Sequence, residues 1–174
     1  MNMVLDQITL RCIEPKDAER LYHYRNDWQV TRLLGGFSTG YSVKDIHDWM
    51  EFHRARTDEI IWTIADKEGD VCLGHVGLYK IDHRIRNAEF AILIGDESWQ
   101  GRGIGQQISH QVIEFGFQQL NLHRIQLSVL ATNSRAIHLY EKLGFKQEGV
   151  LRDGEFRDGG YIDVLIMALL ESEA

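Results

Sequence analysis

The sequence predicts a fold of the α/β (α+β) class, in which helices flank one mixed, mostly antiparallel sheet. Three observations lead to this expectation. The 174 residues match the length of one domain, so we expect residues 1–174 to share a single core. Apolar residues make up 44% and charged residues 26% of the chain, as in ordinary globular proteins. Segments with the two-residue period of strands are interspersed with segments of helical period.

The first third of the chain predicts one strand followed by two helices. Residues 7–12 alternate polar and apolar side chains, which indicates a strand. A helix is expected after Glu14-Pro15, because proline is tolerated in a first helical turn. One face of that helix would carry Ala18, Leu21, Tyr22 and Arg25. A glycine-containing loop is expected from about residue 27 to 41. Ser42-Val43-Lys44-Asp45 resembles a capping box and predicts the second helix.

From residue 60 onward the pattern predicts strands with two further helices between them. The expected strands are 60–65, 71–81, 87–94, 124–130, 145–151 and 161–170. The expected helices are 103–119 and 133–143. The first carries an apolar stripe of Ile104, Ile108, Val112 and Phe115. Gly144 stands where the second helix needs a left-handed residue after its end.

Composition excludes several classes of function. Nineteen Lys and Arg against 26 Asp and Glu give a net charge of −7, which argues against a nucleic-acid partner. Cys12 and Cys72 lie far apart, and no histidine pair has zinc-ligand spacing, so we expect no metal. We find neither a signal-peptide pattern nor an apolar run long enough for a membrane span, and therefore expect a cytoplasmic protein without membrane contact.

Residues 88–105 carry the clearest sign of chemistry. A strand is followed by a short turn and by a glycine-rich loop that opens a helix. Glycines allow close approach of a ligand, and a helix N-terminus offers free N–H groups, so this segment suits a pyrophosphate. The glycines at 101, 103 and 105 match neither the dinucleotide fingerprint nor a Walker A loop. On this segment alone, a glycine-rich turn without a ligand is an equal interpretation.

Two motifs identify a family resemblance. Gln100-Gly101-Arg102-Gly103-Ile104-Gly105 matches the Q/R-x-x-G-x-G/A acetyl-CoA motif of the GCN5-related N-acetyltransferase (GNAT) superfamily. The segment from Asn133 to Phe145 resembles its second motif, N-x-x-A-x-x-x-Y-x-x-x-G-F. The chain looks most similar to the branch of ribosomal-protein N-terminal acetyltransferases and spermidine N-acetyltransferase, and also to amino-sugar acetyltransferases. The resemblance implies the GNAT acyl-CoA N-acyltransferase fold and an acetyl-CoA-dependent N-acetyltransferase.

The resemblance also implies a set of residues that bind acetyl-CoA. The strand at 92–94 would pair with the pantetheine arm, and the loop 100–106 would hold the pyrophosphate through N–H groups. The expected residues are Ile92, Leu93, Ile94, Gln100, Gly101, Arg102, Gly103, Ile104, Gly105, Gln106, Asn133 and Lys142. Arg102 is equally well interpreted as a solvated surface residue. Asn133 is suited to cap a helix, and we expect it to serve both as cap and as ligand.

Tyr140 and Glu89 are the candidate catalytic residues. Attack of an amine on a thioester forms an oxyanion and expels a thiolate, whose sulfur a tyrosine hydroxyl can protonate. The matching position in the family implies this role for Tyr140, although a core tyrosine is the plainer alternative. Glu89 would accept the proton of the amine, directly or through water. A salt bridge from Glu89 to Arg86 or another neighbour is an equal alternative.

The acceptor is expected to be a small-molecule amine or a peptide. The connection 27–41 holds one acid, Asp27, and one base, Arg32, together with Trp28, Phe37 and Gly35-Gly36. Such a loop favours a peptide or protein N-terminus or an amino sugar. A polyamine acceptor such as spermidine or spermine is the alternative, and Asp45, Asp48 and Glu51 on the second helix would then supply carboxylates. An acyl-CoA-binding regulatory module without catalysis is the alternative of another class, and a homo-oligomer fits either.

Overall fold

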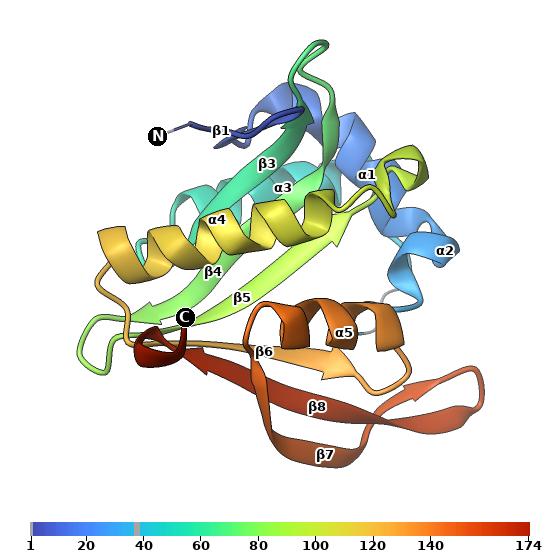
Figure 1. The fold of residues 1–174 in the computed structure, drawn as a ribbon. Helices are drawn as coiled ribbons and strands as arrows, with labels where there is room; N and C mark the ends of the chain where they lie inside the picture. The colour runs from blue at the N-terminus through green and yellow to red at the C-terminus, as the bar shows by residue number, and fades with distance from the viewer. Residues whose placement is uncertain (1, 37–38) are drawn as a thin grey trace.

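The computed structural model describes residues 2–36 and 39–174, and its strands form one eight-stranded sheet (Figure 1). The strands are β1 (Met3–Val4), β2 (Ile8–Cys12), β3 (Ile60–Asp66), β4 (Cys72–Asp82), β5 (Asn87–Ile94), β6 (Arg124–Leu130), β7 (Lys146–Arg157) and β8 (Gly160–Leu170). Their order across the sheet is β1-β2-β3-β4-β5-β6-β8-β7. All neighbours are antiparallel except β5 and β6, which are parallel. The expected mixed, mostly antiparallel sheet is confirmed.

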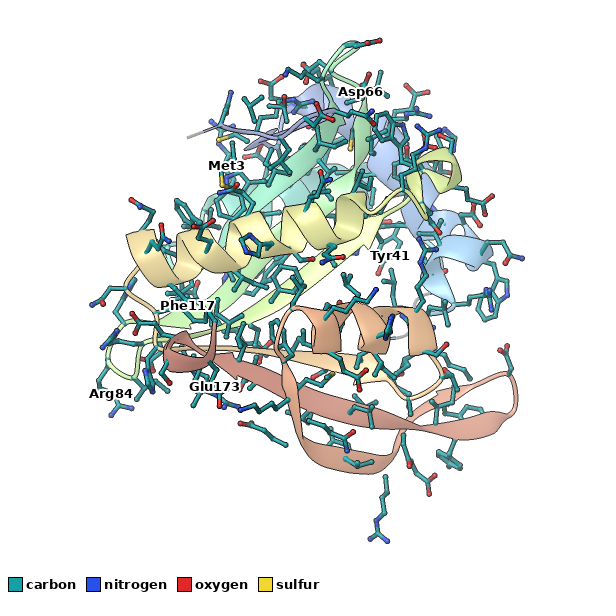
Figure 2. The ribbon with its side chains drawn as sticks, viewed as in Figure 1. Met3, Tyr41, Asp66, Arg84, Phe117 and Glu173 are labelled. Carbon is teal, nitrogen blue, oxygen red and sulfur yellow. The ribbon has the colours of Figure 1, made fainter. Side chains whose placement is uncertain are left out.

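Helices cover both faces of this sheet. They are α1 (Ala18–Asn26), α2 (Trp28–Thr31), α3 (Val43–Arg54), α4 (Ile104–Gln119) and α5 (Ser134–Lys142), with short 3-10 turns at Pro15–Asp17, Glu97–Trp99 and Glu171–Glu173. In Figure 1, α4 crosses the front of the sheet while α1 and α3 lie behind it. The side chains between α4 and the strands form the main core, which includes Leu78, Phe90, Ile108, Val112 and Ile125 (Figure 2). A smaller cluster joins α1 to α3.

Three details differ from the sequence-based expectation. β1 was not expected, because two residues are too few to show a period. The short helix α2 lies within the expected loop 27–41, where the Asp27 carboxylate caps it by accepting from the N–H of Gln29 at 2.8 Å. β7 continues to Arg157 rather than ending near residue 151, since the polar run 152–155 hid the exposed end of the strand. Phe37 lies outside the described residues.

A buried ion pair fixes the start of α1 to the sheet. The Arg11 guanidinium on β2 donates to both carboxylate oxygens of Asp17, each at 2.8 Å. Thr63 on β3 donates its hydroxyl to the same carboxylate at 2.8 Å. Burial raises the pKa of Asp17, but these hydrogen bonds outweigh burial and lower it overall. The ionised pair of Arg11 and Asp17 therefore holds the N-terminal end of α1 against the sheet.

One glycine sets the distance between α1 and the sheet. A Cβ atom on Gly95, directly after β5, would lie 2.1 Å from the ring of Tyr24 on α1. The Tyr24 ring therefore packs on the Gly95 backbone, and its hydroxyl donates to the carbonyl oxygen of Cys72 at 3.1 Å. This contact brings α1 to the end of β5. No helix in the described parts of the chain is long and apolar enough to cross a membrane.

Candidate active site

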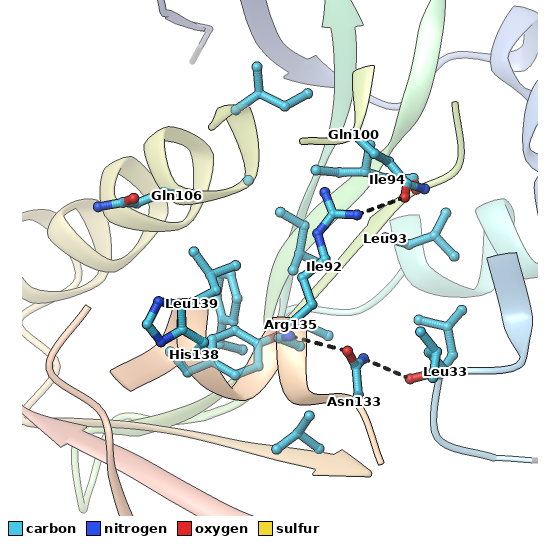
Figure 3. Close-up of a pocket in the computed structure, with 18 of the residues that line it drawn as sticks. Leu33, Ile92, Leu93, Ile94, Gln100, Gln106, Asn133, Arg135, His138 and Leu139 are labelled. Carbon is cyan, nitrogen blue, oxygen red and sulfur yellow. Dashed lines mark hydrogen bonds between the residues drawn. The ribbon is translucent and has the colours of Figure 1, made fainter. Parts of the chain in front are cut away.

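The sheet splits between its two parallel strands. β5 and β6 pair only from Asn87 with Arg124 to Glu89 with Gln126, and then diverge. A cavity of about 530 Å3 lies at this split, between the ends of β5 and β6 and the first turns of α4 and α5 (Figure 3). The edge of β5 beyond Glu89 is not hydrogen-bonded to β6, so its amide groups face the cavity edge. An extended ligand that carries amides can pair with such an edge as an added strand.

Most of the residues predicted from the sequence line this cavity. They are Ile92, Leu93, Ile94, Gln100, Gly101, Gly103, Ile104, Gly105, Gln106, Asn133, Tyr140 and Lys142. Two predicted residues, Glu89 and Arg102, are not among its lining residues. The structure therefore brings together the glycine loop and the start of α5, which lie about 30 residues apart in the chain. The sequence showed them only as two separate motifs.

The glycine loop leads into the N-terminus of α4 with a backbone shape that is suited to an anion. Gly101 and Gly103 have φ values of 77° and 78°, in the left-handed region that favours glycine. Gly103 precedes the first residue of the 16-residue helix α4. The N–H groups of Ile104 and Gly105 lie in the first helical turn, where they have no intrahelical acceptor. Free N–H groups and the positive end of the helix dipole together favour a phosphate.

Hydrogen bonds hold the loop and the start of α5 in place (Figure 3). The Gln100 side chain donates to the carbonyl oxygen of Ile94 at 3.1 Å and accepts from the Arg135 guanidinium at 3.1 Å. The Asn133 side chain caps α5 by accepting from the N–H of Ala136 at 3.1 Å. Its amide also donates to the carbonyl oxygen of Leu33 at 3.2 Å. The expected cap is thus present, and the same side chain ties α5 to the segment after α2.

Tyr140 lies on α5 with its ring buried against two aromatic residues. Its ring centre is 6.3 Å from that of Phe90 and 5.8 Å from that of Phe145. Burial raises the pKa of the phenol to about 12, so the hydroxyl keeps its proton at neutral pH. The hydroxyl makes no hydrogen bond to the described residues, while the residue lines the cavity. A protonated donor without a protein acceptor is therefore available to a ligand.

Glu89 and Arg102 have other contacts. The Glu89 carboxylate forms an ion pair with Lys80 on β4 at 3.0 Å and is partly exposed. Glu89 therefore forms a salt bridge, which was one of its two interpretations. Its partner is Lys80 and not Arg86, which pairs with Glu171. The Arg102 guanidinium lies over the ring of Trp99, with 5.2 Å from its central carbon to the ring centre.

A second cavity of about 700 Å3 adjoins the first. The two cavities share Arg25, Leu34 and Gly35 in their linings. The second is bounded by α2, the following connection and the turn between β7 and β8, including Trp28 and Asp158. A ligand held at the split of the sheet is therefore accessible from the side of α1 and α2 as well.

Sequence analysis missed several lining residues. Arg25, His75, Arg135 and His138 line the first cavity but were not among the predicted site residues. A charged residue on the otherwise apolar face of a helix and a histidine within an apolar strand were available signals for Arg25 and His75. Arg135 and His138 occupy positions that the second motif leaves open. Among the described residues, no group of histidine, cysteine or acidic side chains is arranged to hold a metal ion.

The split sheet, the glycine loop at a helix N-terminus and the tyrosine on the following helix fit the acyl-CoA-dependent N-acyltransferase that the two motifs imply. The family described as "Acetyltransferase (GNAT) domain" matches residues 7–146. The chain therefore belongs to the GNAT acetyltransferase family, and the expected fold, enzyme class and acetyl donor, acetyl-CoA, are confirmed.

Relatives with similar sequences and structures are also N-acetyltransferases by name. The spermidine N(1)-acetyltransferase of Vibrio cholerae is 32% identical over 168 residues, which span 96% of this chain and 95% of that protein. A crystal structure of spermidine N-acetyltransferase from the same organism, in complex with CoA and spermine, matches with a TM-score of 0.88, 30% identity and coverage of 96% and 97%. The Bacillus subtilis protein YdaF, provisionally named a ribosomal N-acetyltransferase, is 30% identical over 98% of this chain and 94% of its own length. Both branches named in the sequence analysis are thus represented.

Proposed function

We propose that this enzyme transfers the acetyl group of acetyl-CoA to the primary amine of a small acceptor that enters through the second cavity. The observation that carries the proposal is that the two cavities adjoin and share Arg25, Leu34 and Gly35 in their linings. One ligand can lie along the β5 edge from the α4 side, while a second ligand reaches the same point from the α1 side. Transfer between two bound molecules requires their reacting atoms to meet in this way.

The residues at the split fit acetyl-CoA. The open β5 edge at Ile92–Ile94 suits the amides of the pantetheine arm, and the N–H groups from Gly103 onward suit the pyrophosphate. Arg135 and Lys142 also line this cavity and add positive charge that favours phosphates. Acetyl-CoA supplies the acetyl group in the activated form of a thioester.

Tyr140 is proposed to provide the proton for the departing sulfur. The hydroxyl lies on the cavity wall without a protein acceptor, and its raised pKa keeps it protonated at every pH at which the enzyme would work. Proton donation to a leaving group requires a protonated donor within reach, and the raised pKa of Tyr140 and its place in the cavity lining support this role.

The acceptor amine must lose a proton before it can react. An amine with a pKa of about 10.4 loses about 4–5 kcal/mol to deprotonation at pH 7. Glu89 shares a sheet face with Leu93, four residues along β5, but its ion pair with Lys80 and its place outside the cavity lining leave only a route through water. We therefore propose that Glu89 is first of all an ion-pair partner, and that solvent in the second cavity takes the proton.

The similar proteins and the chemistry of the two cavities favour different classes of acceptor. The Vibrio cholerae relative acts on spermidine by name, which favours a polyamine over the peptide or amino-sugar acceptor expected from the loop. The linings of the two cavities contain one carboxylate, Asp158, against the cations Arg25, Arg135, Lys142 and Arg157. Multiple ammonium groups are bound best by several carboxylates, so this lining does not itself favour a polycation.

Thiol release from acetyl-CoA across an acceptor panel tests the proposal. The panel contains spermidine, spermine, peptides, amino sugars and amino acids, and mass spectrometry identifies the acetylated product. We expect at least one primary amine to be acetylated with release of one CoA for each product. Binding of CoA without acetylation of any amine would instead support a regulatory acyl-CoA-binding module.

A further inference from the structure

Two side chains at the acceptor end of the cavity have buried nitrogens without a partner. Nε of Arg25 and Nε2 of His75 are both shielded from solvent, and neither has a hydrogen-bond partner among the described residues. Both residues line the cavity that also contains Ala91 and Leu93. They come from α1 and β4, and both contact Trp49 on α3, a helix that lies on the face of the sheet opposite α4 (Figure 1). Their position therefore separates them from the cations near the proposed phosphate site.

Aromatic rings hold Arg25 in position. The central carbon of its guanidinium lies 5.0 Å from the ring centre of Trp49 and 5.4 Å from that of Tyr41. No carboxylate in the described residues forms an ion pair with this guanidinium. A half-buried cation that is fixed by stacking and lacks a counter-ion is unfavourable until an anion pairs with it.

His75 supplies a second donor beside Arg25. The residue is only 6% exposed, and its Nδ1 lies 3.5 Å from the Tyr79 hydroxyl. Burial, with the charges of Arg25 and His53, lowers the pKa of His75 to about 3, so the ring is neutral. When Nδ1 accepts from Tyr79, Nε2 carries the remaining proton and is a donor without an acceptor among the described residues.

The acidic groups near Arg25 and His75 do not cancel the preference of these two residues for an anion. Glu59 is the nearest buried acid of the same cluster, and it is engaged by His53 and by Arg56 at 3.4 Å. Asp158 lines the second cavity, where it is accompanied by Arg157. Arg25 and His75 therefore present donors and positive charge to a ligand, without a carboxylate between them.

The position of His75 also limits the size of the ligand. His75 on β4 is paired with Leu93 on β5, so the two lie one strand spacing apart, about 4.8 Å. Leu93 lies on the part of β5 beyond Glu89, which does not pair with β6 and along which the proposed function places the pantetheine arm. An anionic group bound by Arg25 and His75 would thus lie beside this strand, which favours an acceptor with a short chain between its carboxylate and its amine.

We propose that the acceptor is an α-amino acid or a closely similar amino carboxylate, whose carboxylate is bound by Arg25 and His75. This inference rests on the proposed acetyl transfer and specifies its substrate class. A polyamine has no anion for the pair and would bring a further cation beside Arg25. A peptide N-terminus presents a neutral carbonyl at the position where an amino acid presents its charge.

Matched acceptors that differ only in that charge test the inference. Glycine, L-alanine, L-leucine and L-glutamate are each compared with the corresponding α-amide and with spermidine, by kcat/KM and by calorimetric binding to the CoA-loaded protein. We expect at least one amino acid to exceed its amide and spermidine by about tenfold or more. Hydrogen bonds to charged groups are worth about 1.5–3 kcal/mol, or about 10–100-fold, so Arg25→Gln should reduce binding and kcat/KM of that amino acid by this factor and reduce those of its amide by less, which lowers the preference for the carboxylate.

Two further variants separate the subsite from general effects. His75→Gln keeps a donor of shorter reach and should reduce the preference for the carboxylate less than Arg25→Gln. Arg20→Gln on the same helix is the control, because Arg20 stacks on Tyr24 at 5.8 Å but does not line either cavity. Equal rates for amino acids and amides, or spermidine ahead by tenfold, would overturn the inference while the proposed acetyl transfer stands. Loss of CoA binding, or no acetylation of any amine, would instead reject the transfer itself.

Discussion

Replacing Tyr140 by phenylalanine isolates the proposed proton donor. The substitution removes one oxygen and keeps the ring that packs on Phe90 and Phe145. The hydroxyl has no acceptor among the described residues, so its loss leaves no buried protein group without a partner. We therefore expect the free energy of unfolding to change by less than about 1 kcal/mol, which corresponds to a shift in Tm of at most about 4 °C.

The expected loss of activity is much larger than the loss of stability. A general acid contributes about 10²–10⁴-fold to the rate, equivalent to about 2.7–5.5 kcal/mol of transition-state stabilisation. The decrease should appear in kcat, with the KM for acetyl-CoA little changed, because the ring still fills its part of the cavity wall. The pKa of Tyr140 is raised to about 12, so kcat of the wild-type enzyme should show no loss from Tyr140 ionisation between pH 6 and 9.

Steady-state thiol release at saturating acceptor provides the measurement, and thermal unfolding of the same sample provides the control. A Tyr140→Phe variant that retains kcat within about threefold would refute the assignment of the proton donor. A decrease confined to KM would show that the hydroxyl binds a ligand and does not take part in the chemistry. A Tm that falls by much more than 4 °C would mean that the activity loss follows from structural damage.

Three further predictions address the cofactor loop, Glu89 and the buried ion pair. Gly103→Val places a β-branched residue at a φ of 78° and should weaken CoA binding at least tenfold in a folded protein; unchanged affinity by calorimetry would contradict the loop assignment. Glu89→Gln should lower kcat less than tenfold, matching Lys80→Met, whereas a loss of 10²-fold or more in Glu89→Gln alone would identify a general base. Asp17→Asn should destabilise the fold by about 3 kcal/mol at pH 7, because it leaves Arg11 buried with less compensation. Since folding lowers the pKa of Asp17, this difference is present above about pH 4 and should shrink as the pH falls further; a difference independent of pH in denaturant titrations would be inconsistent with the ionised pair.

Local patterns were sufficient for most elements of the fold. The apolar stripe of α4, the capping box at Ser42 and the left-handed Gly144 are each encoded within a few residues, and the structure places all three as expected. The glycine loop could also be predicted from the sequence, because positive φ at Gly101 and Gly103 is a local property of the backbone. Elements without a clean local pattern were missed, such as the two-residue β1 and the exposed end of β7.

The sequence by itself determined the order of the elements, the glycine loop before α4 and the family, since these depend on short segments of fixed spacing. Only the tertiary structure decided what lies opposite that loop. It paired Glu89 with Lys80 and brought Arg25 on α1 beside His75 on β4, although 50 positions separate these two in the chain. Neither residue has a local pattern that predicts the other. Their proximity follows from the packing of α1 and α3 on the back of the sheet, and such long-range packing is encoded in the whole core rather than in any one segment.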